Sequence, residues 1–176
     1  MFNLTTNYFV LFGIDQAYDV DTKLLKSRYL ELQRQTHPDN FAIESESVQR
    51  ESVQRVAYLN QAYDTLKSPL KRAIYMLQTA GQSFDRETQI QNDPLFLMEQ
   101  MQLREALADV SEQDDPLSAL DKLREDALQN FASQQRVFAQ QLEDQNWLPA
   151  ATEINKMMFS AKLLTEINEQ EETLFD

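Results

Sequence analysis

Glycine is almost absent from this chain, and that scarcity limits the folds open to it. Only Gly13 and Gly81 occur among its 176 residues. Loops that cradle a phosphate or a dinucleotide need several glycines, because only glycine lets backbone amides approach so closely. The sequence also lacks Asn-Gly and Asp-Gly hairpin signals, whereas Leu, Gln, Glu, Ala and Lys are abundant. We therefore exclude a P-loop or GxGxxG site and predict an all-α fold.

Side chains that carry most enzymatic chemistry are scarce. The chain has no cysteine and a single histidine, His37. It therefore has no thiolate nucleophile, disulfide or cysteine-ligated metal of its own, and a Ser-His-Asp system would have to use His37. We expect no catalytic residue, no cofactor and no metal site. A hydrolase built on His37 is the one enzymatic alternative.

The first residues indicate a cytoplasmic protein. Residues 1–20 have no basic start, and their apolar run is too short and interrupted for a secretory signal. No stretch of the chain reaches the ~18 consecutive apolar residues of a membrane span. We expect no membrane segment and no targeting signal.

Charge divides the chain into two halves. Residues 1–83 carry nine basic and nine acidic side chains, whereas residues 84–176 carry seven basic and twenty acidic ones. An acidic second half argues against nucleic-acid binding, because Lys and Arg supply most of the affinity for a phosphate backbone. The asymmetry suggests two modules with different partners.

The boundary between these modules is predicted from a polar stretch with Gly81 and Pro94 at its ends. We expect a first domain at residues 1–80, a linker at residues 81–94 and a second domain at residues 95–176.

A proline ends the first long helix. Asp21 precedes a helical pattern whose predicted buried stripe is Leu25, Tyr29, Leu32 and Thr36. The opposite face is basic, with Lys23, Lys26 and Arg34. Pro38 lacks an amide hydrogen and disfavours helical geometry at His37, so a fixed turn follows at His37-Pro38-Asp39. A second long helix, with Val48, Val56, Leu59, Tyr63 and Leu66 on one face, is predicted antiparallel to the first, followed by a short helix at Leu70–Leu77.

From Asn7 to Tyr75 the order of motifs around His37-Pro38-Asp39 resembles a J-domain. The resemblance implies a co-chaperone that docks on a DnaK-class ATPase and stimulates its ATP hydrolysis. Lys23, Lys26 and Arg34 are then the docking candidates, and His37, Pro38 and Asp39 form the activating turn. A helical adaptor whose turn has lost this activity is an alternative.

The apolar pattern of the second half predicts a three-helix bundle. Its helices are expected at Leu95–Glu112, Pro116–Gln145 and Leu148–Glu172, with Asp115 and Pro116 starting the middle one. The middle helix has one apolar face, made of Leu117, Leu120, Leu128, Phe131, Phe138 and Leu142. The third is predicted to bury Ile154, Met158, Ala161 and Leu164, with Phe159 and Leu163 pointing away.

The first helix of this bundle has more apolar surface than one packing face needs. Phe96, Leu103, Leu107 and Val110 fall within an arc of roughly 40°. Leu97, Met98 and Met101 lie about 100° to 200° around from Phe96. This second face either packs on the first half, forms a homodimer, or is an exposed patch that binds a protein client.

The stretch from Phe96 to Glu105 resembles the start of the C-terminal domain of HscB-type co-chaperones of iron-sulfur cluster assembly, and the match covers essentially the whole chain. That resemblance implies that the acidic bundle binds the cluster scaffold protein. The scaffold-binding residues would be Leu97, Met98, Met101, Gln102, Glu105, Asp109 and Phe159. Gln102 departs from the pattern, since an acidic residue is often expected there. Delivery of a different protein client is the alternative function.

Overall fold

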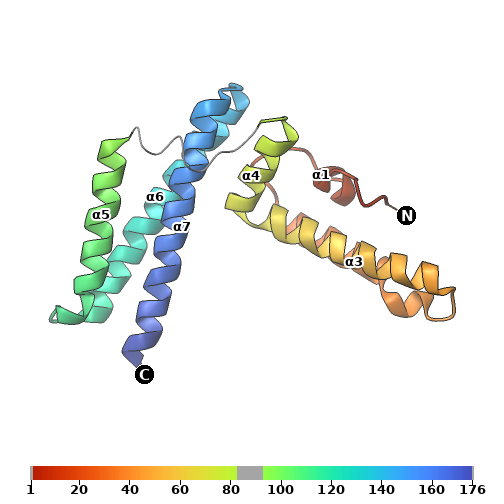
Figure 1. The fold of residues 1–176 in the computed structure, drawn as a ribbon, viewed down its shortest axis with the longest axis horizontal. Helices are drawn as coiled ribbons and strands as arrows, with labels where there is room; N and C mark the ends of the chain where they lie inside the picture. Colours follow the sequence, from red (N-terminus) through yellow and green to blue (C-terminus); the bar gives the residue numbers. More distant parts are fainter. Residues whose placement is uncertain (1, 83–92, 176) are drawn as a thin grey trace. The chain divides into compact units, whose positions relative to one another are not determined.

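The computed structural model describes residues 2–82 and 93–175, and every regular element in these two ranges is helical. The all-α fold predicted from the sequence is therefore confirmed (Figure 1). The chain divides into two compact units, Met1–Met76 and Leu77–Asp176. Most of the linker expected at residues 81–94 lies outside the described residues.

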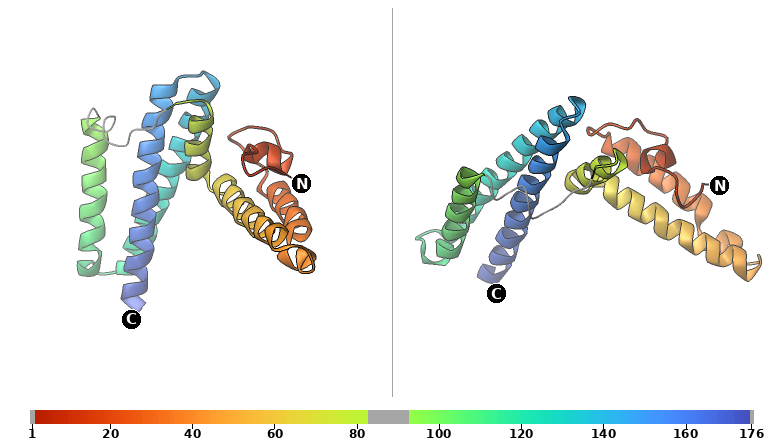
Figure 2. Two further views of the ribbon diagram at one scale, coloured as in Figure 1. Left: turned by 45° about the vertical axis from the view of Figure 1, so that its right-hand side comes forward. Right: turned by 45° about the horizontal axis from the view of Figure 1, so that its top comes forward.

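An antiparallel helix pair forms the frame of the first unit. Its elements in chain order are α1 (Tyr8–Phe12), α2 (Thr22–Thr36), the 3₁₀ turn η1 (Pro38–Phe41), α3 (Glu46–Lys67) and the start of α4 (Pro69–Thr79). Figure 2 shows α2 and α3 side by side. Leu25 of α2 and Leu59 and Leu66 of α3 are fully buried. Burying their apolar surface is the main force that holds the pair together.

Local signals set where the helices of this unit start and stop. The Asp21 carboxylate accepts hydrogen bonds from the amides of Lys23, at 2.9 Å, and Leu24, at 3.0 Å, and so caps α2 at the position where the helical pattern was predicted to begin. Gly13 ends α1 in the left-handed region with φ of 60°, which a residue with a side chain rarely adopts.

A buried arginine fixes the start of α4. The Arg72 guanidinium donates a 2.7 Å hydrogen bond to the carbonyl of Leu66 and lies 5.1 Å from the centre of the Tyr18 ring. Burial lowers the pKa of Arg72, and burial also raises the pKa of Tyr18 to about 12.

A second helix pair forms the frame of the other unit. Its elements in chain order are α5 (Pro94–Ala108), the 3₁₀ turn η3 (Asp109–Glu112), α6 (Pro116–Glu143) and α7 (Trp147–Phe175). Helix α6 packs along α7, whereas α5 touches both of them at fewer points. Asp115 caps α6 through the amide of Ser118, at 3.1 Å, as predicted. One core cluster joins the elements and consists of Leu107, Val110, Leu120, Ala127, Leu163 and Ile167.

Two predictions about the faces of the long helices are wrong. Leu117 and Leu128 of α6 are 41% and 50% exposed, because they lie about 60° to 80° from the line through the buried Leu120 and Phe138. Leu163 was predicted to point away from the core but is buried in it. Helix α7 contacts both α5 and α6, so its buried arc is wider than one face.

Two predicted ends also differ. The last turn of the helix expected at Leu95–Glu112 is the 3₁₀ turn η3, and α6 stops at Glu143 rather than Gln145, which has a positive φ of 56°.

Truncating a core residue and an exposed residue of α6 should give different losses of stability. Phe138→Ala should lower the free energy of unfolding by about 3–5 kcal/mol, since the side chain is fully buried. Leu128→Ala should lower it by less than about 1 kcal/mol. Urea titrations followed by circular dichroism measure both, and equal losses would contradict the observed faces of α6.

Candidate functional site

The His37-Pro38-Asp39 turn ends α2 and begins η1, and the side chains of His37 and Asp39 are exposed to solvent, whereas Pro38 is half-buried. His37 is the C-cap residue of α2, and Pro38 is the first residue of η1. Pro38 cannot continue α2 because it has no amide hydrogen, but the first residue of a helix needs none. The imidazole Nδ1 of His37 accepts a 3.3 Å hydrogen bond from the Asp39 amide. A neutral ring that accepts at Nδ1 carries its proton on Nε2, which makes it a hydrogen-bond donor for a partner. The Asp39 side chain is 88% exposed and lies 3.5 Å from Nδ1, so this carboxylate is available to a cation.

Asn40 stabilises this turn, and the sequence analysis did not single it out. Its side-chain amide donates a 2.7 Å hydrogen bond to the carbonyl of Arg34, and its backbone amide donates to the carbonyl of His37. These bonds satisfy carbonyls that the end of α2 leaves without helical partners. An asparagine three residues after a predicted helix end was the available signal.

The basic face of α2 is exposed as predicted. Lys23, Lys26 and Arg34 are all exposed, and within residues 2–82 and 93–175 none of them forms a salt bridge. The orientation of this face is fixed by Tyr29, whose ring stacks on Tyr63 of α3 with centroids 4.2 Å apart. These cations therefore lie exposed on a helix that packing holds in place.

In the second unit, a latch joins the start of α5 to α7. The Asp93 carboxylate caps α5 by accepting from the Phe96 amide at 3.1 Å and lies 3.2 Å from Nζ of Lys156. The Phe96 ring meets Phe159 of α7 edge to face, with centroids 5.5 Å apart. Asp93, which the sequence analysis placed in the linker, is thus part of the bundle.

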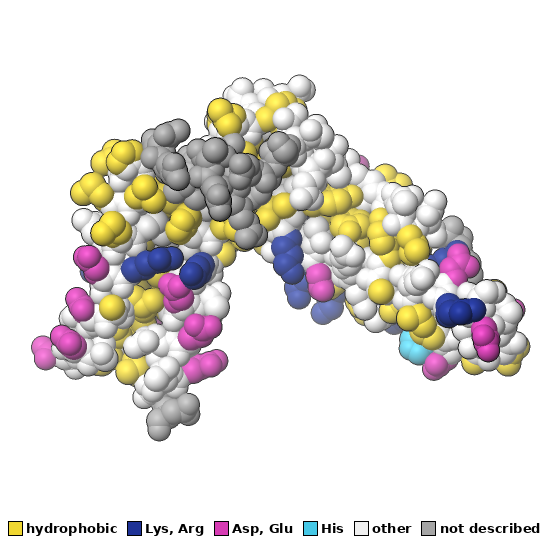
Figure 3. Space-filling model, viewed as in Figure 1, with side chains coloured by type: hydrophobic (Ala, Val, Ile, Leu, Met, Phe, Trp, Pro, Cys, Tyr) yellow, Lys and Arg dark blue, Asp and Glu magenta, His cyan; other side chains and the backbone are white. Residues whose placement is uncertain are grey.

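Beyond this latch, α5 presents an apolar surface to solvent. Met98 is 58% exposed and Met101 is 62% exposed, whereas Leu97 and Phe159 are half-buried. Figure 3 shows hydrophobic side chains gathered near the start of α5 and acidic ones toward its end. Gln102, Glu105 and Asp109 are exposed there. Gln102 and Asp109 also line a groove between α5 and α6, and Asp109 begins η3, farther along.

One further exposed residue of this region was missed. Leu95 is 73% exposed in the first turn of α5. A leucine directly after a helix-starting proline, outside the buried stripe, was the available signal.

The described residues show neither a metal site nor a membrane span. No group of His, Cys, Asp and Glu side chains in residues 2–82 and 93–175 is arranged to hold a metal ion. No helix in these ranges combines the length and apolarity needed to cross a bilayer.

A helix pair closed by a His-Pro-Asp turn, followed by an acidic helical unit, defines a co-chaperone of the J-domain class. Residues 92–168 match the family profile of the HSCB C-terminal oligomerisation domain. The chain is 42% identical over 168 residues to the "Co-chaperone protein HscB homolog" of Vibrio atlanticus (strain LGP32), covering 96% of this chain and 98% of that one. This chain belongs to the HscB family of co-chaperones.

Solved structures of the family have the same fold. The chaperone HscB from Vibrio cholerae superimposes with a TM-score of 0.87 at 42% identity, covering 96% of this chain and 99% of that one. The human co-chaperone protein HscB gives a TM-score of 0.88 at 27% identity, covering 96% and 84% of the two chains.

The latch predicts how Asp93 titrates. The hydrogen bond from the Phe96 amide, followed by that from Lys156, lowers the pKa of Asp93 below its ordinary value of 3.8. A lowered folded-state pKa means that the contribution to stability is complete above the unfolded value and is lost as the pH falls through the folded value. Carbon-13 NMR of the Asp93 carboxyl should show a midpoint below 3.8.

A matched variant separates the two causes. Lys156→Met should raise this midpoint but leave it below 3.8, because the Phe96 amide still donates. A wild-type midpoint at or above 3.8 would show that the latch does not form.

Proposed function

We propose that this chain binds an iron-sulfur cluster scaffold protein in the cytoplasm, delivers it to a specialised DnaK-class chaperone and stimulates the ATPase of that chaperone. The chain itself performs no chemistry in this account. The observation that carries the proposal is that two exposed surfaces of different character occur on separate units. A basic helix face with the His-Pro-Asp turn belongs to the first, and an apolar face with acidic neighbours belongs to the second.

The first unit supports docking on the ATPase. We assign residues 1–80 as the J-domain, with Lys23, Lys26 and Arg34 attracting an acidic surface of the chaperone. The Asp39 carboxylate and the half-exposed His37 ring then contact the chaperone through hydrogen bonds that the stiff Pro38 turn positions. A ligand shifts an equilibrium only by its differential affinity for the two states. The turn must therefore bind the hydrolysis-competent state of the chaperone more tightly.

The second unit supports binding of the scaffold protein. We assign residues 95–176 to this role, with Leu97, Met98 and Met101 as apolar contacts and Phe159 packed beside them. Methionine side chains adapt to an irregular partner surface, and their exposure here leaves them free to be buried on binding. Gln102, Glu105 and Asp109 form a polar edge that carries two charges rather than three.

Truncating the exposed methionines should weaken scaffold binding without unfolding the chain. Met98→Ala and Met101→Ala should each cost about 1 kcal/mol or more of binding free energy, because each removes an anchor that the complex buries. Isothermal titration calorimetry with the purified scaffold protein measures the effect. The matched control is Leu148→Ala, which removes a 66% exposed apolar side chain from α7 outside the proposed surface.

Unchanged affinity in both methionine variants would discard the surface. If no binding to the scaffold protein is detected at all, the bundle delivers a different client.

Substitutions in the first unit should affect the ATPase instead. His37→Gln should abolish stimulation of single-turnover ATP hydrolysis by the DnaK-class chaperone, and Lys26→Ala should raise the concentration needed for half-maximal stimulation. Lys71→Ala is the control, since it removes an exposed cation from α4 rather than from α2. Full stimulation by the His37 variant would show that the turn is not needed for ATPase stimulation. The chain would then be only a helical binding module.

A further inference from the structure

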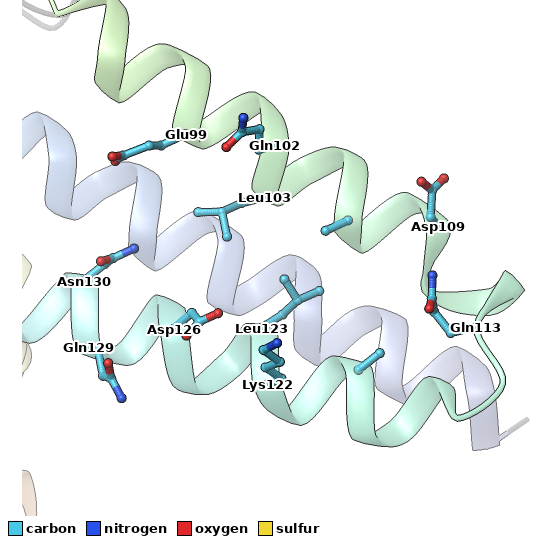
Figure 4. A pocket seen from close by; sticks show the side chains of 12 residues that line it. Glu99, Gln102, Leu103, Asp109, Gln113, Lys122, Leu123, Asp126, Gln129 and Asn130 are labelled. Atoms are coloured by element: carbon cyan, nitrogen blue, oxygen red, sulfur yellow. The ribbon is translucent and has the colours of Figure 1, made fainter.

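A groove runs between α5 and α6 within the second unit, next to the proposed scaffold surface, and Gln102 and Asp109 from the polar edge of that surface are among its lining residues. The volume of this groove is about 660 Å³. Figure 4 shows Leu103 of α5 and Leu123 of α6 pointing toward each other at its floor, with Glu99 and Asp109 at the α5 edge. Ala106 and Ala119 also line the groove, and their small side chains leave the space open.

The way α5 is held explains why this groove exists. The start of α5 is latched by Asp93 and Lys156, and just past its end Val110 is fully buried in the core. Between these two anchors α5 touches α6 at few points, and both floor leucines stay half-buried. Leu103 and Leu123 pack against the core cluster on one side only, so part of their apolar surface stays exposed along the middle of α5.

The charge around the groove identifies the chemistry of what fits it. Glu99, Asp109 and Asp126 line it, against one cation, Lys122. Residues 99–130 as a whole contain nine acidic and three basic side chains. The other two basic residues are Arg104 and Arg124. Arg124 is paired with Asp121 at 2.8 Å and with Glu171. An acidic groove with an apolar floor complements a segment that carries both basic and apolar side chains.

We propose that this groove takes a lysine- or arginine-bearing segment of the scaffold protein, with an apolar side chain seated over Leu103 and Leu123. The inference rests on the proposed function. The groove face of α5 and the face with Met98 and Met101 are roughly 120° apart around the helix. The scaffold protein therefore contacts α5 from two sides and reaches α6.

A charge reversal inside the groove and one beside it test the proposal. Asp126→Lys should weaken the affinity for the purified scaffold protein roughly fivefold or more, whereas Glu125→Lys, which reverses an exposed charge outside the groove lining, should change it by less than about twofold. Raising the salt concentration from about 0.05 M to about 0.5 M should shrink this difference, because salt screens exposed charges.

A second variant tests the space rather than the charge. Ala106→Trp fills the groove from α5 at an exposed position, so it should weaken binding while the thermal unfolding midpoint stays near that of the wild type. The proposal is overturned if both groove variants bind the scaffold protein like Glu125→Lys. It is also overturned if the two groove variants abolish self-association of this chain in sedimentation experiments and leave its affinity for the scaffold protein unchanged.

Different results would contradict the role of the groove and the binding of the scaffold protein. If Met98→Ala weakens binding while the groove variants do not, the groove inference is wrong and the proposed function stands. If the wild-type chain does not bind the scaffold protein, both are wrong.

Discussion

The packing of α6 along α7 is the constraint on which the second unit depends. Its core joins Leu120 and Ala127 of α6 to Leu163 and Ile167 of α7. Helix α5 is added to this pair through the Asp93 latch at its start, through Leu103 and Leu107, which pack in the same core, and through the buried Val110 just past its end. A helix held in this way keeps its position while most of its surface stays open to a partner. The pairing of α2 with α3 has the same role for the basic face and the turn.

Features that depend on local chemistry were predictable from the sequence. The end of α2 at His37, the Asp21 and Asp115 caps and the buried stripe through Phe96, Leu107 and Val110 all occur where the pattern placed them. Each is decided by residues within one or two helical turns, through a missing amide, a capping carboxylate or the helical period.

Features that depend on which helices become neighbours were not predictable. Leu163 was assigned to the wrong side of α7 because periodicity cannot show that this helix packs against two others. The latch between Asp93 and Lys156 joins positions far apart in the chain, so no spacing rule indicates it. The sequence also indicated an unpartnered face on α5, but not the groove beside it. Its lining combines Ala106 of α5 with Ala119 of α6, which become neighbours only when the two helices pack.

The central claim is coupling, meaning that one chain must present the scaffold protein and the activating turn together. The most direct test is single-turnover ATP hydrolysis by the DnaK-class chaperone with the scaffold protein present. It compares the wild type with an equimolar mixture of the His37→Gln and Met98→Ala/Met101→Ala variants, each of which keeps one surface intact. The account predicts that the mixture fails to reproduce the scaffold-dependent rise in hydrolysis. A mixture as effective as the wild type would contradict it.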